Sequence, residues 1–169
     1  MSTQRTAKET IDLSITVNGT EYEREVPSRM LLVHFLRDEL GLTGSRVGCE
    51  TSSCGCCTTL LDGRRVKSCT LLAAQANNRE VTTIEGLADD EELNVVQQTF
   101  SQKHALQCGY CTAGMVMSAH GLLSEGEELS RDEIKHGMAG NLCRCTGYNF
   151  IVDAIEEAAA SDNLPDEAL

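Results

Sequence analysis

The stretch Gly48-Cys49-Glu50-Thr51-Ser52-Ser53-Cys54-Gly55-Cys56-Cys57 contains four of the nine cysteines, and Cys69 follows after eleven further residues. Three of these cysteines have the C-x₄-C-x₂-C spacing of plant-type iron–sulfur ligation, with a fourth thiolate farther along the chain. Gly48 and Gly55 permit the positive φ angles and close backbone approach that a loop around two irons needs. The stretch therefore predicts a [2Fe-2S] site whose ligands are Cys49, Cys54, Cys57 and Cys69.

The composition is that of a small globular protein with few aromatic side chains. The chain has 169 residues, of which 41% are hydrophobic and only 4% aromatic, with no Trp. We therefore expect bound metal at the cysteines to add stability that a large aromatic core would otherwise provide. Residues 1–10 contain no apolar signal-peptide segment, and no later apolar run has membrane-spanning length. These features predict a cytoplasmic protein without a transmembrane segment, in a compartment that disfavours disulfides.

The formal net charge is −12, and the acidic residues are spread over the whole chain. Such a charge repels phosphate backbones, so it argues against a nucleic acid as a partner. We interpret most of the acidic residues as a solvated surface.

Outside the cysteine stretch, the first half of the chain has the patterns of a small mixed sheet. Residues 11–17 alternate between apolar and polar, Asn18-Gly19 is a strong hairpin signal, and a return strand follows. Residues 28–40 predict a helix capped by Ser28. A second hairpin around Asp62-Gly63 joins strand 58–61 to a return strand that ends near Cys69. With a closing strand over residues 80–84, this order predicts a ferredoxin-like β-grasp.

In the second half of the chain, the apolar residues recur with the period of an α-helix. We expect a helix that starts near Leu93, helices over residues 112–124 and 148–160, and a shorter helix introduced by a capping box from Ser130 to Glu133. The predicted fold class is α+β: a plant-type ferredoxin-like domain followed by a four-helix bundle with pseudo-two-fold symmetry. The expected parts are an N-terminal arm (1–10), the ferredoxin-like domain (11–87), a helical domain (88–160) and an acidic tail (161–169).

Two segments of the helical half form a weak internal repeat. Cys108-Gly109-Tyr110-Cys111 and Cys143-Arg144-Cys145 each supply two thiolates just before a predicted helix. Helix N-termini favour a negatively charged iron–thiolate cluster, because their free N–H groups and positive dipole end point toward it. A pseudo-two-fold that joins the segments predicts a second [2Fe-2S] site, with ligands Cys108, Cys111, Cys143 and Cys145.

Other chemistry fits the same residues. Four thiolates also suit a structural zinc ion. A thioredoxin-like cysteine pair belongs near a βαβ unit, which this half lacks. Rieske ligation needs two histidines in Cys-x-His spacing, and no histidine of this sequence has it. Cys56 is left over, and it is interpreted as a small buried residue or as a substitute ligand for Cys57.

Four motifs in series extend the argument: residues 48–58, residues 81–87, the run from Gln107 to Thr112, and Gly140-Asn141-Leu142-Cys143-Arg144-Cys145-Thr146-Gly147-Tyr148. Together they resemble the iron–sulfur subunit of the xanthine oxidase family of molybdenum hydroxylases. The resemblance runs from about residue 11 to residue 160. Cys56 departs from it, because Ala or another small residue is expected there.

The resemblance implies an electron-transfer function. Electrons would pass one at a time from a molybdopterin centre through the second cluster, then through the first, to FAD. Gln107 would hydrogen-bond the pterin, and Cys145 would both ligate iron and lie against the pterin. The loop formed by Glu50, Thr51, Ser52 and Ser53 would face the flavin subunit. No residue of this chain would act on the substrate.

The resemblance also implies partner subunits. The chain has no Gly-rich dinucleotide fingerprint and is too short to add a molybdenum or flavin domain. We therefore expect molybdopterin, in its dinucleotide form, on a large subunit and FAD on a medium subunit, in a dimer of heterotrimers. Two alternatives stay open: a free-standing two-cluster ferredoxin, and a one-cluster interaction module with a zinc-stabilised helical domain.

Overall fold

The computed structural model describes residues 9–88, 92–126 and 128–161. Most of the expected N-terminal arm and nearly all of the acidic tail lie outside these residues. Within the described ranges, no helix has both the length and the apolar character needed to cross a bilayer.

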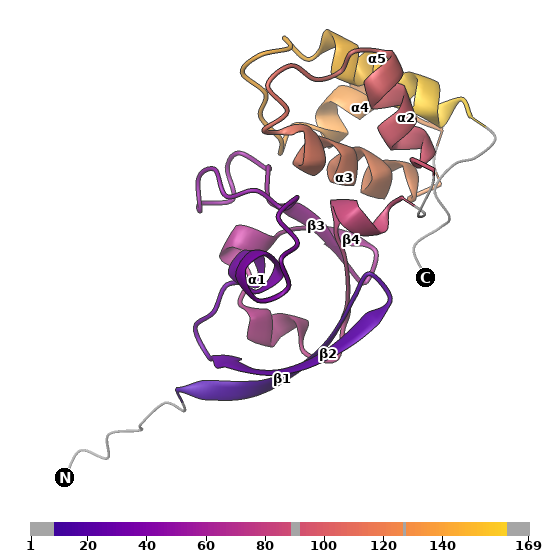
Figure 1. The fold of residues 1–169 in the computed structure, drawn as a ribbon. Coiled ribbons are helices and arrows are strands. Elements are labelled where there is room, and N and C mark those ends of the chain that lie inside the picture. Colours follow the sequence, from indigo (N-terminus) through magenta and orange to yellow (C-terminus); the bar gives the residue numbers. More distant parts are fainter. Residues whose placement is uncertain (1–8, 89–91, 127, 162–169) are drawn as a thin grey trace.

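The N-terminal part is a five-stranded mixed sheet of order β2-β1-β5-β3-β4. β1 pairs with β5 in parallel, and the other neighbours are antiparallel. This arrangement and the helices around it (Figure 1) fit the predicted α+β class and the ferredoxin-like β-grasp. The strands are β1 (Thr10–Val17), β2 (Thr20–Pro27), β3 (Thr58–Leu61), β4 (Arg64–Lys67) and β5 (Glu80–Thr82).

Both predicted hairpins are confirmed. Asn18 and Gly19 have φ angles of 50° and 74°, and Asp62 and Gly63 have 47° and 73°. Two positive φ angles in a two-residue loop match the right-handed twist of the strands on either side. The closing strand is shorter than predicted, because the chain turns into a 3₁₀-helix at Ile84–Gly86.

The predicted helix over residues 28–40 is wrong in its start. Helix α1 spans only Leu32–His34 and continues as a π-helix over Phe35–Glu39. The N-cap is Leu31, which has no side-chain capping bond. Ser28 instead lies in a turn, where its N–H donates to the carbonyl oxygen of Glu9. The short helix is held by burial, since Leu32 and the first π-helical residues are fully enclosed.

Four helices form the described C-terminal part. The predicted capping box is confirmed, with Ser130 as N-cap and Glu133 at the third helical position. A second capping box, Asn94 with Gln97, starts the preceding helix and was not predicted. The helices are α2 (Val95–Gln102), α3 (Thr112–Leu123), α4 (Arg131–Gly137) and α5 (Asn149–Ala159).

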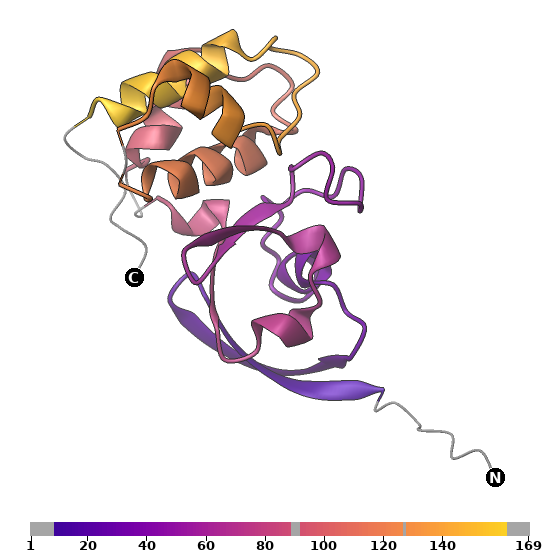
Figure 2. The same cartoon turned by 180° about the vertical axis from the view of Figure 1, so that it is seen from behind.

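The described residues form one large apolar core between the sheet and α1, another among α2–α5, and a small third cluster of Val33, Cys57 and Cys69. Figures 1 and 2 show the four helices beyond one end of the sheet, with α3 nearest to β3. A Cβ atom added to Gly114 would lie 2.2 Å from the carbonyl oxygen of Gly55. The glycine therefore lets α3 approach the backbone of the first cysteine loop.

Candidate metal centres

The loop over residues 49–57 turns repeatedly through positive φ angles. Glu50, Ser52 and Gly55 have φ angles of 53°, 61° and 75°. This path directs the backbone N–H groups of Thr51 and Cys54 at the Sγ of Cys49, each at 3.4 Å. The hydrogen bonds, with those from Thr51 contributing most, lower the pKa of Cys49 to about 6. Because the thiolate is the metal-binding form, this loop favours ligation.

The four candidate ligands of the first centre fall into two pairs. Cys49 and Cys54 are joined within the loop, where the N–H of Cys54 donates to the Sγ of Cys49 at 3.4 Å. Cys57, just before β3, is hydrogen-bonded to Cys69, which lies in the 3₁₀-helix Ser68–Thr70 after β4. The second pair is buried, and burial raises the pKa of Cys57 to about 11.

The second set of cysteines is also brought together in pairs. The Sγ atoms of Cys145 and Cys108 are 3.6 Å apart, and Cys111 and Cys143 are hydrogen-bonded through their side chains. Cys108 and Cys145 are exposed, whereas the inner pair is half-buried. Each pair joins one cysteine from each of the two predicted segments.

Helix starts position these cysteines. Cys111 is the N-cap of α3 and follows Gly109, whose φ angle is 80°. The N–H and hydroxyl of Thr146 donate to the Sγ of Cys143 at 3.5 and 3.2 Å. Burial opposes ionisation of Cys143, but these hydrogen bonds outweigh it, so its pKa lies below the ordinary value. For Cys111 burial is the largest cause, and it raises the pKa to about 12.

This pairing fits a binuclear cluster. Each iron of a [2Fe-2S] cluster takes two protein ligands, whereas a structural zinc takes four on one ion. The first loop is also shaped closely around its thiols, since a Cβ on Gly48 would lie 2.8 Å from the Sγ of Cys56 and 3.0 Å from that of Cys54.

Cys56 is buried, as predicted, with 3% of its surface exposed. Its Sγ donates to the carbonyl oxygen of Arg46 at 3.2 Å and lies 3.2 Å from the Sγ of Cys54. Burial is the main cause that raises the pKa of Cys56 to about 12. Its burial and its hydrogen bond to the backbone fit the predicted role of a small packed residue.

The residues predicted to contact other cofactors lie at the surface. Gln107 is exposed beside Cys108, and Glu50 is exposed in the first loop. Thr51 and Ser53 are exposed and hydrogen-bonded to each other, while half-buried Ser52 is bonded to the hydroxyl of Thr70. Their predicted contacts with pterin and flavin stay predictions.

The structure places the two candidate centres next to each other, which the sequence did not indicate. The N–H of Leu142 donates to the carbonyl oxygen of Cys54 at 2.9 Å. The hydroxyl of Tyr110 donates to the carbonyl oxygen of Val47 at 2.6 Å. These contacts join residues that are far apart in the chain, so no local pattern could have revealed them.

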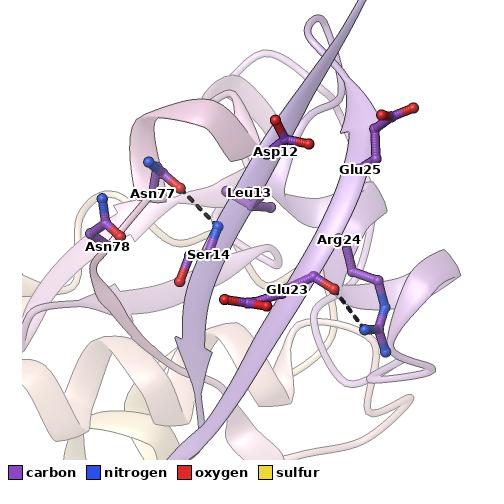
Figure 3. A pocket seen from close by; sticks show the side chains of 8 residues that line it. All are labelled: Asp12, Leu13, Ser14, Glu23, Arg24, Glu25, Asn77 and Asn78. Atoms are coloured by element: carbon purple, nitrogen blue, oxygen red, sulfur yellow. Dashed lines mark hydrogen bonds between the residues drawn. The ribbon is translucent and has the colours of Figure 1, made fainter.

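A separate hollow of about 480 Å³ lies on the β1–β2 hairpin (Figure 3). Its wall includes Glu23, Arg24 and Asn77, and the amide oxygen of Asn77 accepts from the N–H of Ser14 at 2.8 Å. Its lining contains no cysteine or histidine, so it belongs to neither candidate centre.

Comparison with known proteins matches each half to a family. The 2Fe-2S iron-sulfur cluster binding domain matches residues 15–88, and the [2Fe-2S] binding domain matches residues 83–156. Subunit beta of the 6-hydroxypseudooxynicotine dehydrogenase complex of Paenarthrobacter nicotinovorans is 48% identical over 86% of this chain and 92% of its own. The xanthine dehydrogenase iron-sulfur-binding subunit of Escherichia coli O157:H7 is 41% identical over 87% and 93%.

A solved structure agrees with these relatives. A chain of quinoline 2-oxidoreductase from Pseudomonas putida 86 superposes with a TM-score of 0.86 at 46% identity. The match covers 92% of this chain and 99% of that one. Similarity therefore extends over both cysteine-bearing halves together.

Proposed function

Because the chain belongs to the iron–sulfur subunits of the xanthine oxidase family of molybdenum hydroxylases, we propose that it is the electron-transfer subunit of such an enzyme complex. The observation that carries the proposal is the presence of two neighbouring cysteine sites, each made of two thiol pairs and each within a matched [2Fe-2S] family. When bound, each cluster takes up and releases one electron, which links a two-electron donor to a two-electron acceptor in single steps.

In this proposal each iron is held by one thiol pair. The first centre uses Cys49 with Cys54 and Cys57 with Cys69, and the second uses Cys108 with Cys145 and Cys111 with Cys143. The side-chain contacts within these pairs support the assignment. Backbone N–H groups such as that of Thr51 would then hydrogen-bond the ligand sulfurs.

We place the second centre toward the molybdopterin subunit and the first toward the FAD subunit. Exposure of Cys145 and Gln107 supports their contact with molybdopterin, in its dinucleotide form. Exposure of Glu50, Thr51 and Ser53 supports a flavin-facing loop. Electrons would then run from molybdopterin through the second and first centres to FAD.

Exposed apolar side chains support a partner at the second centre. Among the described residues, five of the seven large hydrophobic side chains that are exposed lie in, or within five residues of, the two segments that carry this centre. We infer that these side chains form an apolar patch around the second centre, and such a patch on a charged protein marks an interaction surface. Its members are Leu106, Tyr110, Leu142, Tyr148 and Phe150.

The wider assembly follows the relatives. Their names describe subunits beta and gamma and a small subunit, which supports large and medium partners for this chain. We further propose a dimer of these heterotrimers, located in the cytoplasm, where a reducing environment keeps the cysteines available as ligands. The names of the relatives include caffeine, nicotine and xanthine, so we assign substrate selection to the large subunit.

The internal organisation is part of the same proposal. Residues 11–87 and 88–160 would form separate domains, which the two apolar cores support. The second would be a four-helix bundle with pseudo-two-fold symmetry. In support, α2 and α4 each begin with a capping box, and α3 and α5 each follow a cysteine segment with a glycine at positive φ.

The test is low-temperature EPR with spin quantitation on the iron-loaded chain after anaerobic dithionite reduction. Two distinct S = 1/2 signals that integrate to about two spins per chain are expected for two [2Fe-2S] centres. One signal of about one spin, with zinc in place of the missing iron, would overturn the relay and favour the zinc-stabilised module. Purification of the tagged chain from its native host separates the remaining alternative, since a free-standing ferredoxin would bring neither molybdenum nor FAD with it.

A further inference from the structure

Lys67 is a cation placed between the two centres. It is the last residue of β4, two positions before Cys69, and it pairs with Thr58 across the β3–β4 ladder. Its half-buried ammonium donates to the hydroxyl of Thr58 and to the amide oxygen of Asn141, each at 2.8 Å. Within the described ranges, no carboxylate forms an ion pair with Lys67. The two oxygens that accept its hydrogen bonds are therefore both uncharged.

The ammonium lies beside the first centre, because Thr58, to which it donates, directly follows Cys57. Burial is the main cause that lowers the pKa of Lys67, and the charge of Arg65 adds to it, whereas the charges of Cys57, Cys54 and Cys69 oppose that shift. Through Thr58 and Asn141, the ammonium is thus held next to the loop that carries the ligands of this centre. Partial burial limits screening by solvent, so a charge here acts more strongly than one on the surface.

Asn141 holds the ammonium in place. Only 3% of its surface is exposed, and its amide nitrogen donates to the carbonyl oxygens of Gly55 and Gly114 at 3.0 and 2.9 Å. Its amide oxygen accepts from Ser118 at 2.9 Å as well as from Lys67. The side chain thereby joins the first cysteine loop, α3 and the segment that leads to the second centre.

We propose that Lys67, positioned by Asn141, raises the reduction potential of the first centre. This inference rests on the proposed function, because it needs a [2Fe-2S] cluster at Cys49, Cys54, Cys57 and Cys69. One-electron reduction adds one negative charge to the cluster, and a fixed positive charge beside the ligands stabilises that added charge. The effect favours electron transfer from the second centre toward the first. Lys67 and Asn141 act here through the electrostatics of the site and do not ligate metal.

The experiment is an EPR-monitored redox titration of the full iron-loaded chain. Lys67→Gln removes the charge and keeps a hydrogen-bonding side chain, Lys67→Met removes both, and Lys67→Arg keeps a permanent positive charge. The matched control is Lys135→Met, which removes a lysine that pairs with Asp132 on exposed α4. The signal that Cys49→Ser abolishes is assigned to the first centre.

We expect Lys67→Gln and Lys67→Met to lower the potential of the first centre alone. At a fixed solution potential, the ratio of reduced to oxidised first centre falls about tenfold. This corresponds to a decrease of about 59 mV in the reduction potential of a one-electron couple. Lys67→Arg and Lys135→Met leave both potentials unchanged.

Other outcomes overturn the inference without ambiguity. An unchanged first potential in Lys67→Gln, or equal shifts of both centres, excludes a specific electrostatic role for Lys67. If Lys67→Met loses iron, Lys67→Gln still decides the matter, because it replaces only the charge. Failure of the proposed function is distinct, since the unmodified chain would then lack one of the two EPR signals.

Discussion

At the scale of single residues, hydrogen bonding and burial distinguish cysteines that look alike in the sequence. Cys49 receives two backbone N–H groups, and its pKa falls to about 6. Cys56 receives none of these and instead donates its own proton to the carbonyl oxygen of Arg46. The two side chains lie in one loop, yet the first accepts hydrogen bonds from the backbone and the second uses its own proton to hold the backbone of Arg46.

This difference predicts that Cys56 is dispensable for cluster binding. We expect Cys56→Ala to retain both EPR signals at about two spins, with a loss of stability of about 1 kcal/mol from the missing hydrogen bond. Cys57→Ala is the matched neighbour and should lose the first signal. Spin quantitation and iron analysis measure both variants. If Cys56→Ala lost the first centre, Cys56 would have to be counted as a ligand.

At the scale of elements, α3 connects the two halves of the molecule. Its N-terminus carries Cys111, and Gly114 lies against the backbone of the first cysteine loop. Farther along, the ring of His120 contacts the amide of Asn94, which caps α2. One helix thus links the second centre, the first loop and the start of another helix.

Gly114→Ala should be more disruptive than a usual glycine-to-alanine change within a helix. The new Cβ would lie 2.2 Å from the oxygen of Gly55 and 2.7 Å from the Cα of Cys56, and backbone atoms cannot easily move away. Overpacking costs about 1–3 kcal/mol, which exceeds the helix-propensity gain of about 1 kcal/mol. Denaturant unfolding of the iron-loaded protein measures the difference.

Gly121→Ala is the control on the same helix. There the added Cβ would meet the side chains of Arg65 and Leu60, which can shift. We expect a smaller loss of stability than for Gly114→Ala. Equal effects at both positions would show that the close approach at Gly55 is not the cause.

His120 should make stability depend on pH near neutrality. Burial lowers its pKa below the ordinary value of 6.5, so the unfolded chain binds the proton more readily than the folded one. Its contribution to stability is present above pH 6.5 and is lost as the pH falls toward the lowered pKa. The loss is about 1.4 kcal/mol for each unit of the shift.

Thermal or denaturant unfolding between pH 8 and pH 5.5 checks this sign. Replacement by glutamine (His120→Gln) removes the titrating group, so the variant should lose less stability than the parent chain over that range. A parent chain whose stability rose on acidification would contradict the assignment. Equal pH dependence in both proteins would mean that another group is responsible.

At the scale of the whole molecule, the second centre lies in an exposed apolar setting on an otherwise acidic chain of net charge −12. The first centre has its ligand pair Cys57 and Cys69 buried against the sheet. This asymmetry gives the two centres different surroundings, and it supports the proposed contact of a partner subunit at the second centre.

Phe150→Ser should weaken assembly with the large subunit and leave both clusters intact. Phe150 is the second residue of α5 and belongs to the patch around the second centre. Its surface is 51% exposed. We expect at least a tenfold loss of affinity, about 1.4 kcal/mol or more, as for an aromatic residue buried at an interface. Titration of the purified subunits measures it.

Leu93→Ser is the control for this change, because Leu93 is 50% exposed but lies outside the patch. It should leave the affinity unchanged. Similar losses for both variants would indicate a general effect on solubility, and no loss for Phe150→Ser would place the interface elsewhere.

Much of the fold was predictable because its signals are local. The hairpins at Asn18-Gly19 and Asp62-Gly63 depend on two residues each, and the cap of α4 depends on Ser130 and Glu133. The start of α1 was missed, because burial of Leu32 rather than a capping side chain determines it. The ligand set for the first centre also came from spacing alone, and it stays a prediction until metal is measured.

By itself, the amino-acid sequence determined the strand and helix types, the cysteine spacing and the family, since each depends on residues close together in the chain or on motifs in series. Only the tertiary structure decided which thiols pair, such as Cys108 with Cys145, and that Lys67 meets Asn141 beside the first centre. These contacts join residues distant in the chain. Their geometry depends on how the helices pack on the sheet, which leaves no periodic pattern in the sequence.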